Sequence, residues 1–208
     1  MIKTKTLFAD VYWAKIPSEM GQNVLFPPER QKEIIACGNE KVRRQKYYAW
    51  KLLEYALRES LGCKIGDLEL FKGNNGKWTS SSCYFSLSHS HSAVAVAVSD
   101  YPIGVDVEKL VPEKAEFLQR VLTEQERAEF ALLVDEKSRL EYLFESWTKK
   151  ESVFKKAGDG SFRPTKIAVD KNFVTTKKVL IDGEEYLLSV AAENVTGVRN
   201  FVGVELTE

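Results

Sequence analysis

The sequence lacks several features that mark common functional classes. Its 208 residues contain three cysteines, Cys37, Cys63 and Cys83, and no two of them form a CxxC pair. This spacing argues against a disulfide scaffold and against a zinc site, and it is typical of reduced thiols in a cytoplasmic protein. Basic and acidic residues balance at 30 each, so the net charge does not point to nucleic acid as a partner.

Long apolar runs and glycine-rich nucleotide motifs are absent as well. No window is apolar enough to cross a bilayer, and residues 1–5 precede no apolar stretch. We therefore expect a cytoplasmic protein with no membrane partner. The sequence has no GxxxxGK[ST] and no GxGxxG, which argues against a P-loop or Rossmann site. Its 44% hydrophobic content suffices for the core of one domain or two small ones.

Capping and alternation signals predict an α+β fold. Asn39 and Gly62 predict the ends of one long helix, and the capping box of Thr123 and Glu126 starts another. Gly158 is expected to end a third helix, and Asp182-Gly183 predicts a β-hairpin. The predicted strands are 7–16, 84–89, 93–98, 103–108, 167–169, 179–181, 186–190 and 201–206, and the predicted helices are 28–38, 40–61, 111–120, 124–134 and 135 or 138 to 156.

The order of these elements suggests two similar α+β halves related by a pseudo-twofold axis. Each half would be an antiparallel-rich sheet with packed helices, the first covering residues 1–108 and the second residues 109–208. Within the first half, the strands at 84–89, 93–98 and 103–108 are expected to form a meander. No low-complexity linker separates the halves, so we expect them to pack tightly, with a site where they meet.

A first group of candidate site residues lies on the strand at 103–108. Ile103, Val105 and Val107 alternate with polar positions, so Asp106 and Glu108 point the same way. Two like charges side by side raise each other's pKa unless a cation lies between them.

A second group lies on the helix that precedes Gly158. Leu140, Leu143, Phe144, Trp147 and Phe154 recur at helical spacing, and Glu151 falls on this apolar seam one turn before Lys155. If the helix packs on the strand at 103–108, three carboxylates converge in a way that suits Mg²⁺. The alternative is a polar strand face at a sheet edge together with an ordinary surface pair of Glu151 and Lys155. The residues alone leave both interpretations open.

Further polar residues could bind phosphate. Ser88 and His89 end a predicted strand, and Lys77 follows a Gly-Asn-Asn-Gly turn. Arg43, Arg44 and Lys51 gather on one face of the helix at 40–61, which is either a solvated cationic face or an anion site.

Three motifs together resemble the signature of the 4′-phosphopantetheinyl transferases, in the larger, pseudo-dimeric Sfp-like subgroup. They are Phe85-Ser-Leu-Ser-His-Ser90, Ile103-Gly-Val-Asp-Val-Glu108 and Trp147-Thr-Lys-Lys-Glu-Ser-Val-Phe-Lys155. Their order and separations both fit, over roughly residues 40 to 165. His91 departs from the pattern, where the resemblance leads us to expect a small turn residue.

The resemblance implies an enzyme that takes coenzyme A and an apo acyl or peptidyl carrier protein. A carrier serine would attack the β-phosphate of coenzyme A, and 3′,5′-ADP would leave. Asp106, Glu108 and Glu151 would hold Mg²⁺, Glu151 would activate the serine, and Lys155 would serve the cleaved phosphate. Lys77, Ser88 and His89 would bind coenzyme A phosphates, Arg43, Arg44 or Lys51 would bind the 3′-phosphate, and Glu124 would assist near the metal. Two halves in one chain imply a monomer.

Two other functions stay open at this point. The chain could be a carrier-protein or coenzyme A binding module that has lost transfer, or an unrelated Mg²⁺-dependent phosphohydrolase. The four residues Asp106, Glu108, Glu151 and Lys155 together argue against the binding module, which has no need of all four.

Overall fold

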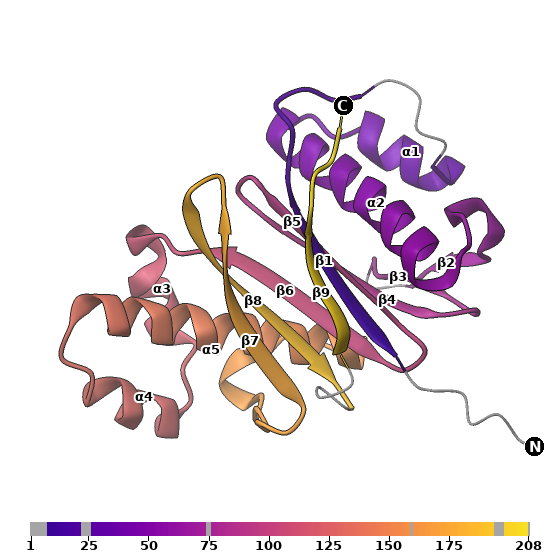
Figure 1. Ribbon diagram of the computed structural model, residues 1–208. Coiled ribbons are helices and arrows are strands. Elements are labelled where there is room, and N and C mark those ends of the chain that lie inside the picture. The colour runs from indigo at the N-terminus through magenta and orange to yellow at the C-terminus, as the bar shows by residue number, and fades with distance from the viewer. Residues whose placement is uncertain (1–7, 22–25, 74–75, 159, 194–197, 208) are drawn as a thin grey trace, which may run out of the picture.

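The structure is a computed structural model that describes residues 8–21, 26–73, 76–158, 160–193 and 198–207. Blocks of helices and strands alternate along the chain, as Figure 1 shows. In chain order the elements are β1 (Ala9–Lys15), α1 (Pro28–Ile35), α2 (Glu40–Leu61), β2 (Leu70–Lys72), β3 (Trp78–Ser80), β4 (Tyr84–Ser90), β5 (Ala93–Ser99), β6 (Ile103–Lys109), α3 (Ala115–Arg120), α4 (Glu124–Ala131), α5 (Glu136–Ala157), β7 (Val174–Ile181), β8 (Glu184–Ala192) and β9 (Val198–Val204), with 3₁₀ turns at Ile65–Asp67, Pro112–Lys114 and Pro164–Lys166.

The long helices begin and end where their capping residues predict. Asn39 Oδ1 accepts the Val42 N–H at 3.0 Å, and Gly62 closes α2 with a left-handed backbone at φ 68°. In α5 Asp135 Oδ1 accepts the Ser138 N–H at 2.8 Å, and Gly158 closes the helix at φ 80°. These predictions are confirmed because each cap satisfies backbone groups that the helix itself leaves unpaired.

The β7–β8 hairpin is also confirmed, and one predicted strand is wrong. Asp182 and Gly183 both have positive φ, 58° and 76°, as the tight hairpin turn requires. Residues 167–169 are not a strand. They follow a 3₁₀ turn and line a cavity beside α4 and α5, and none of the strand ladders among the described residues includes them. Three successive apolar residues after Pro164 were thus not enough to predict a strand.

The strands form two main sheets and a small β2–β3 ribbon, with orders β4-β5-β1-β9 and β6-β8-β7 in the main sheets. The expected meander is wrong in its third strand, because β6 pairs with β8 rather than with β4 or β5. Conversely, β9 pairs in parallel with β1 in the first sheet. The sheets thus exchange strands across the predicted boundary at residue 108, and the division into two halves stays a prediction.

The two halves nevertheless repeat the same order of elements. Helices α2 and α5 have 22 residues each, and their caps Asn39 and Asp135 lie 96 positions apart, as do Gly62 and Gly158. A hairpin and a third strand follow in both cases, β4–β5 with β6 and β7–β8 with β9. Each third strand joins the sheet of the other half. This internal repetition agrees with the predicted pseudo-twofold α+β fold.

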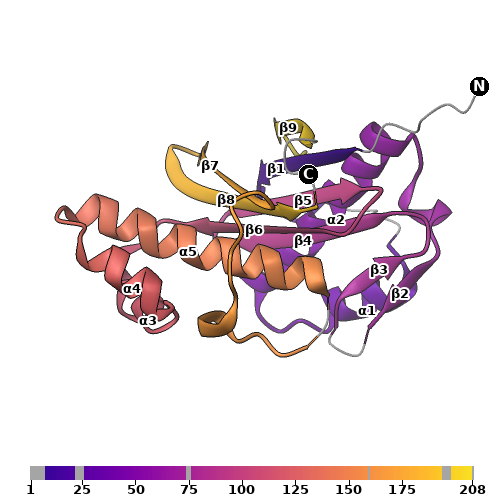
Figure 2. The same ribbon diagram turned by 90° about the horizontal axis from the view of Figure 1, so that it is seen from below.

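The elements stack in layers, with the two sheets between two sets of helices (Figure 2). One core lies between α2 and the first sheet, and another lies between α5, α3, α4 and the second sheet. The third core joins the two sheets, where small residues of β5 (Ala93, Ala95 and Ala97) face Val105 and Val107 of β6. Small side chains on β5 let the sheets approach each other, which brings β4 next to β6.

An ion pair fastens β9 to the first sheet. Asp10 of β1 is fully buried, and its carboxylate accepts both the Nε–H of Arg199, at 3.1 Å, and an Nη2–H of the same guanidinium. A buried carboxylate is costly without such a partner. The pair therefore helps to fix β9 in the sheet of the other half.

Candidate active site

Serine side chains join the two sheets where β4 runs beside β6. Three alternate serines of β4 accept hydrogen bonds from backbone N–H groups of β6, in place of the carbonyl oxygens of a normal ladder. The bonds run from Val105 N to Ser86 Oγ (3.0 Å), from Val107 N to Ser88 Oγ (3.3 Å) and from Lys109 N to Ser90 Oγ (3.4 Å). All three serines are buried, so these bonds satisfy amides that would otherwise lack partners.

Two of these serines also hold the predicted acids. Ser88 Oγ donates to Asp106 Oδ1 at 2.7 Å, and Ser90 Oγ donates to Glu108 Oε2 at 2.6 Å. Glu108 Oε2 also accepts from Lys114 Nζ at 2.9 Å. The sequence predicted Ser88 as a phosphate ligand. In this structure its hydroxyl points to Asp106, and its role toward phosphate stays a prediction.

Gly104 lets helix α5 lie directly on β6. A Cβ atom at this position would stand 1.9 Å from the carbonyl oxygen of Ser152 and 2.5 Å from the amide nitrogen of Lys156. Both contacts are with backbone, which cannot move aside as a flexible side chain can. The helix faces β6 and β8 with Thr148 and Ser152, both fully buried, instead of large apolar residues. This close approach carries Glu151 and Lys155 to the acids of β6.

The predicted apolar seam of α5 is therefore partly wrong. Leu143 and Phe144 are buried as expected, but Trp147 and Phe154 are only half-buried. They lie on a flank of the helix, where both rings contact Phe162, at centroid distances of 5.4 and 5.1 Å. The side of α5 that faces the sheet needs small residues because β6 lies so close. The hydrophobic pattern of the sequence does not reveal this close approach.

The ammonium of Lys155 lies between two of the acids. Its Nζ stands 2.7 Å from Asp106 Oδ1, 3.0 Å from Ser88 Oγ and 3.9 Å from Glu151 Oε2. The backbone carbonyl of Lys155 in turn accepts from Lys77 Nζ at 2.5 Å. The structure thus brings Lys77, Ser88, Asp106, Glu151 and Lys155 into one connected group.

Burial raises the pKa of both acids that Lys155 contacts. Asp106 is 4% exposed, and its desolvation raises its pKa, against the lowering effect of Lys155. For Glu151, burial raises the pKa to about 7, with Lys155 lowering it and the charges of Asp106 and Glu108 raising it. Each acid is thus less acidic than in water, because the protein removes solvent and groups like charges.

The raised pKa of Glu151 predicts a stability that depends on pH. The native protein holds a proton that the unfolded chain releases between pH 4.5 and about 7, so stability falls as the pH rises through this window. Glu151→Gln removes the loss of stability that accompanies deprotonation of Glu151. We expect the metal-free variant to be more stable than the wild type at pH 8 by up to about 3 kcal/mol, and the gain to vanish below pH 4.5.

Urea unfolding of both proteins at the two pH values measures this difference. The same change at Glu145, which pairs with Lys149 on the outer side of α5, is the matched control. An equal effect of Glu151→Gln at both pH values would contradict the assigned cause.

The donor set of the three acids fits a hard divalent cation. Carboxylate oxygens are the ligands Mg²⁺ prefers, and Asp106 Oδ2 is buried without a hydrogen-bond partner among the described residues. As placed, the described side chains do not gather three His, Cys, Asp or Glu ligands around one point. Lys155 takes the space between Asp106 and Glu151, and Glu108 turns to Lys114. The assignment of Asp106, Glu108 and Glu151 as metal ligands stays a prediction.

A basic cavity of about 370 Å³ opens beside this group. Five basic side chains line it, from α1, α2, the β2–β3 connection, β4 and α5. They are Arg30, Lys46, Lys77, His89 and Lys155. Trp50 and Trp78 form part of the wall, with their rings 5.2 Å apart and at 81° to each other. Positive charge next to aromatic rings suits an anionic ligand that carries a flat ring system.

Sequence reasoning missed Arg30 and Lys46. Arg30 is 8% exposed, donates to Glu33 and to the Lys46 carbonyl at 2.9 Å each, and lies over the Trp50 ring. Its Nε is buried without a partner among the described residues. One signal was available: Lys46 precedes Trp50 by one helical turn, so the two share a face of α2.

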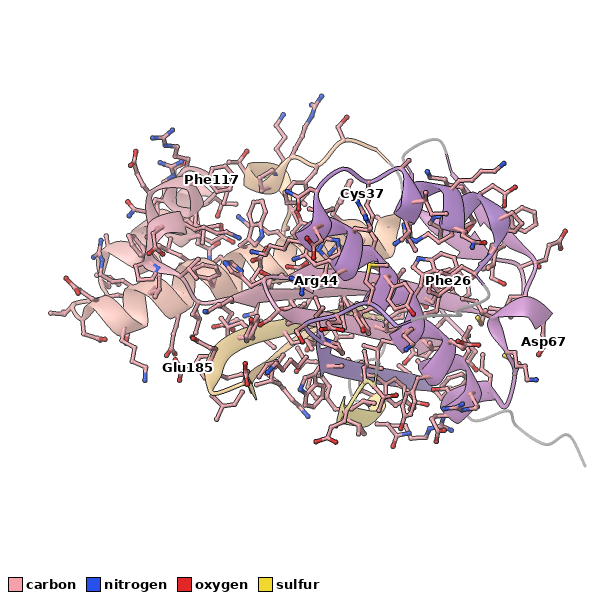
Figure 3. The ribbon with its side chains drawn as sticks, turned by 90° about the horizontal axis from the view of Figure 1, so that it is seen from above. Phe26, Cys37, Arg44, Asp67, Phe117 and Glu185 are labelled. Carbon is pink, nitrogen blue, oxygen red and sulfur yellow. The ribbon has the colours of Figure 1, made fainter. Side chains whose placement is uncertain are left out.

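The three basic residues predicted for the 3′-phosphate lie elsewhere. Arg43 Nε donates to the Cys37 carbonyl at 2.9 Å, and Arg44 donates to the Ser18 carbonyl. Figure 3 shows Arg44 on α2 and Cys37 in the connection between α1 and α2. Lys51 donates to the Thr207 carbonyl at 2.8 Å and lines a different cavity. None of the three lines the basic cavity. Arg44 and Lys51 project from other faces of α2 than Lys46 does, and the Arg43 guanidinium is held by the Cys37 carbonyl.

The remaining candidates lie outside the connected group around Lys155. His89 lines the basic cavity, where loss of solvent and then the charge of Lys155 lower the pKa of its imidazole. His91 occupies the β4–β5 turn with φ 51°, its carbonyl held by buried Gln45 at 3.0 Å. Glu124 is exposed at the start of α4, in a cavity away from Lys155.

Fold and site together define an α+β protein whose acidic and basic groups meet where β4, β6 and α5 lie side by side. A family model described as the 4′-phosphopantetheinyl transferase superfamily matches residues 102–202. Over these residues, 101 of the 208, the chain is similar to this superfamily. These residues include β6 and α5, and thus Asp106, Glu108 and Glu151.

Individual relatives agree with this family. The chain is 25% identical to the 4′-phosphopantetheinyl transferase gsp of Aneurinibacillus migulanus over 80% of its own length and 73% of that protein. It is 33% identical to the 4′-phosphopantetheinyl transferase Sfp of Bacillus subtilis over 39% of its length and 36% of that protein. For psf-1 of Bacillus pumilus the identity is 36%, over 38% and 34%. The last two matches thus span about a third of the relatives.

Proposed function

We propose that this protein transfers the 4′-phosphopantetheine group of coenzyme A to a serine of an apo acyl, peptidyl or aryl carrier protein. The reaction would need Mg²⁺ and release 3′,5′-ADP. One observation carries the proposal: the connected group of Asp106, Glu151 and Lys155 lies directly beside a cavity lined by basic side chains. The names of gsp, Sfp and psf-1 as 4′-phosphopantetheinyl transferases support it.

The basic cavity suits the nucleotide part of coenzyme A. Its phosphates carry several negative charges, which Lys46, Lys77 and Arg30 can neutralise, and the adenine ring can lie against aromatic walls. The diphosphate would then reach Lys155 at the edge of the cavity. The reacting phosphorus would thus lie next to the acids of β6 and α5.

The acids and Lys155 divide the chemistry between them. Glu151 accepts the proton of the carrier serine, whose oxygen forms a bond to the β-phosphorus. The bond from this phosphorus to the bridging oxygen breaks, and its electron pair leaves with 3′,5′-ADP, where the Lys155 ammonium stabilises the charge. Mg²⁺, held by Asp106, Glu108 and Glu151, would neutralise the phosphate oxygens when bound.

A carrier surface is best supported next to α3 and α4. Large apolar side chains are exposed there: Phe117, Leu132 and Val134 are 53%, 81% and 96% exposed. Where such residues form a contiguous patch, they mark a protein contact. No helix in the described part of the chain is long and apolar enough to span a membrane. We further place the enzyme in the cytoplasm as a monomer, in keeping with its free thiols and its two halves in one chain.

Mass spectrometry of a carrier protein tests the function. The enzyme is incubated with coenzyme A, Mg²⁺ and an apo-carrier, and the carrier is weighed. A gain of one phosphopantetheine, dependent on Mg²⁺, is the expected result. An unchanged carrier that still binds the protein would support a binding module instead, and phosphate release without a carrier would support a phosphohydrolase.

Two lysines five positions apart on α2 test the basic cavity. Lys46→Met should weaken coenzyme A binding by about 10- to 100-fold, since a charge-assisted hydrogen bond to phosphate is lost. Lys51→Met should leave it unchanged, because Lys51 lies over Tyr47 and Tyr48 at another cavity. Calorimetric titration of coenzyme A into each variant measures both. The reverse ranking would contradict the role of Lys46 and would support Lys51, one of the three sequence-predicted candidates for the 3′-phosphate.

A further inference from the structure

Lys155 occupies the position at which a cation is needed between the acids. Its ammonium contacts Asp106 Oδ1 at 2.7 Å and Glu151 Oε2 at 3.9 Å. Asp106 is almost completely buried, so its charge is costly without a cation nearby. In the absence of metal, Lys155 is the cation that both acids contact. In the free protein, Lys155 therefore neutralises the charge of Asp106 and Glu151, as a divalent ion would do in the metal-bound protein.

One space cannot hold two cations at once. A divalent ion that ligated Asp106 and Glu151 would lie within a few ångströms of the Lys155 ammonium, and the two positive charges would repel. The side chain of Lys155 has another place to go, because it also lines the basic cavity and is 25% exposed. Its backbone stays fixed, since Lys77 Nζ holds the carbonyl at the last turn of α5.

We propose that Lys155 acts as a built-in counter-ion that keeps divalent metal out of the free enzyme, and that a phosphate of coenzyme A draws it away and opens the metal position. The inference rests on the proposed function, since it takes the metal and coenzyme A from there. It adds an order to the reaction: coenzyme A prepares the acids, and the metal binds tightly only afterwards. Free enzyme thus holds Asp106 and Glu151 neutralised without sequestering metal.

The proposal implies cooperative binding of metal and coenzyme A. If coenzyme A raises the metal affinity by some factor, the metal must raise the affinity for coenzyme A by the same factor. In this proposal, part of the coupling comes from the movement of the Lys155 side chain. Neutralising that side chain should therefore strengthen metal binding to the free enzyme and reduce the coupling.

Mn²⁺ binding, followed by electron paramagnetic resonance at pH 8 without coenzyme A, tests this. Lys155→Met keeps the length of the side chain and removes its charge. We expect it to bind Mn²⁺ about tenfold or more tightly than the wild type, comparable to the effect of a neighbouring charge on a carboxylate. Lys155→Arg, which keeps the cation, should bind as weakly as the wild type. Lys149→Met is the matched control, because Lys149 pairs with Glu145 of its own helix.

The outcomes separate this inference from the proposed function. Circular dichroism first verifies that each variant is folded. If Lys155→Met binds Mn²⁺ no better than the wild type while coenzyme A still promotes metal binding in the wild type, the counter-ion role is overturned and the proposed function stands. If no protein binds Mn²⁺, with or without coenzyme A, both are overturned. Tighter binding in Lys155→Met, with less promotion by coenzyme A, supports the proposal.

Discussion

Gly104→Ala is expected to destabilise the protein by more than about 3 kcal/mol and to abolish transfer. An added methyl group in a packed core costs about 1–3 kcal/mol, and more where nothing can yield. At Gly104 the new Cβ would meet the backbone of Ser152 and Lys156 at 1.9 and 2.5 Å. Helix α5 must then move away from β6, and Glu151 and Lys155 move with it.

Denaturant unfolding and the carrier assay measure the two effects of Gly104→Ala. Gly38→Ala is the matched control, because a Cβ atom there meets nothing within 4 Å among the described residues. We expect the control to retain stability and transfer. A Gly104→Ala variant with both properties intact would show that α5 does not lie as close to β6 as described.

Glu151→Gln is expected to lower the transfer rate by at least about 100-fold while coenzyme A still binds. General-base catalysis contributes about 10²- to 10⁴-fold, and the amide cannot accept the serine proton. Coenzyme A binding should survive because Glu151 does not line the basic cavity. The variant is also the one expected to gain stability at pH 8, so lost activity would not reflect unfolding.

The mass of the carrier over time gives the transfer rate, and calorimetric titration gives the affinity for coenzyme A. Together the two measurements separate chemistry from binding. Glu145→Gln on the outer side of α5 controls for the loss of a negative charge near the site. Wild-type transfer by Glu151→Gln would remove Glu151 from the role of base. Loss of coenzyme A binding would instead place it in the binding of substrate.

The part of the candidate site that could be predicted is the part where a sequence motif agrees with the periodicity of its strand or helix. Alternation on β6 places Asp106 and Glu108 on one side, and helical spacing places Lys155 one turn after Glu151. The structure brings Asp106, Glu151 and Lys155 together, as expected. Of the basic residues that line the cavity, Lys77, His89 and Lys155 were predicted, whereas Arg30 and Lys46 were not. Arg30 and Lys46 meet only because α1 packs on α2.

Lys51 shows the limit of reasoning from one helix. Lys46 and Lys51 are both basic residues of α2, only five positions apart. Lys46 lines the basic cavity, whereas Lys51 lines a different cavity. The helical period says which residues share a face, but not which face meets the ligand. That choice depends on which side of α2 packs on the first sheet.

The amino-acid sequence alone determined where the long helices start and stop, and how the polar residues alternate on β6. These features depend on neighbours a few positions away, whose caps and spacing act in any fold. Tertiary structure alone decided that β6 and β9 exchange sheets, that serine hydroxyls join β4 to β6, and that small residues face β6 from α5. Those features depend on contacts between segments that are distant in the sequence. The local periodicity of the sequence does not reveal the energy of such contacts.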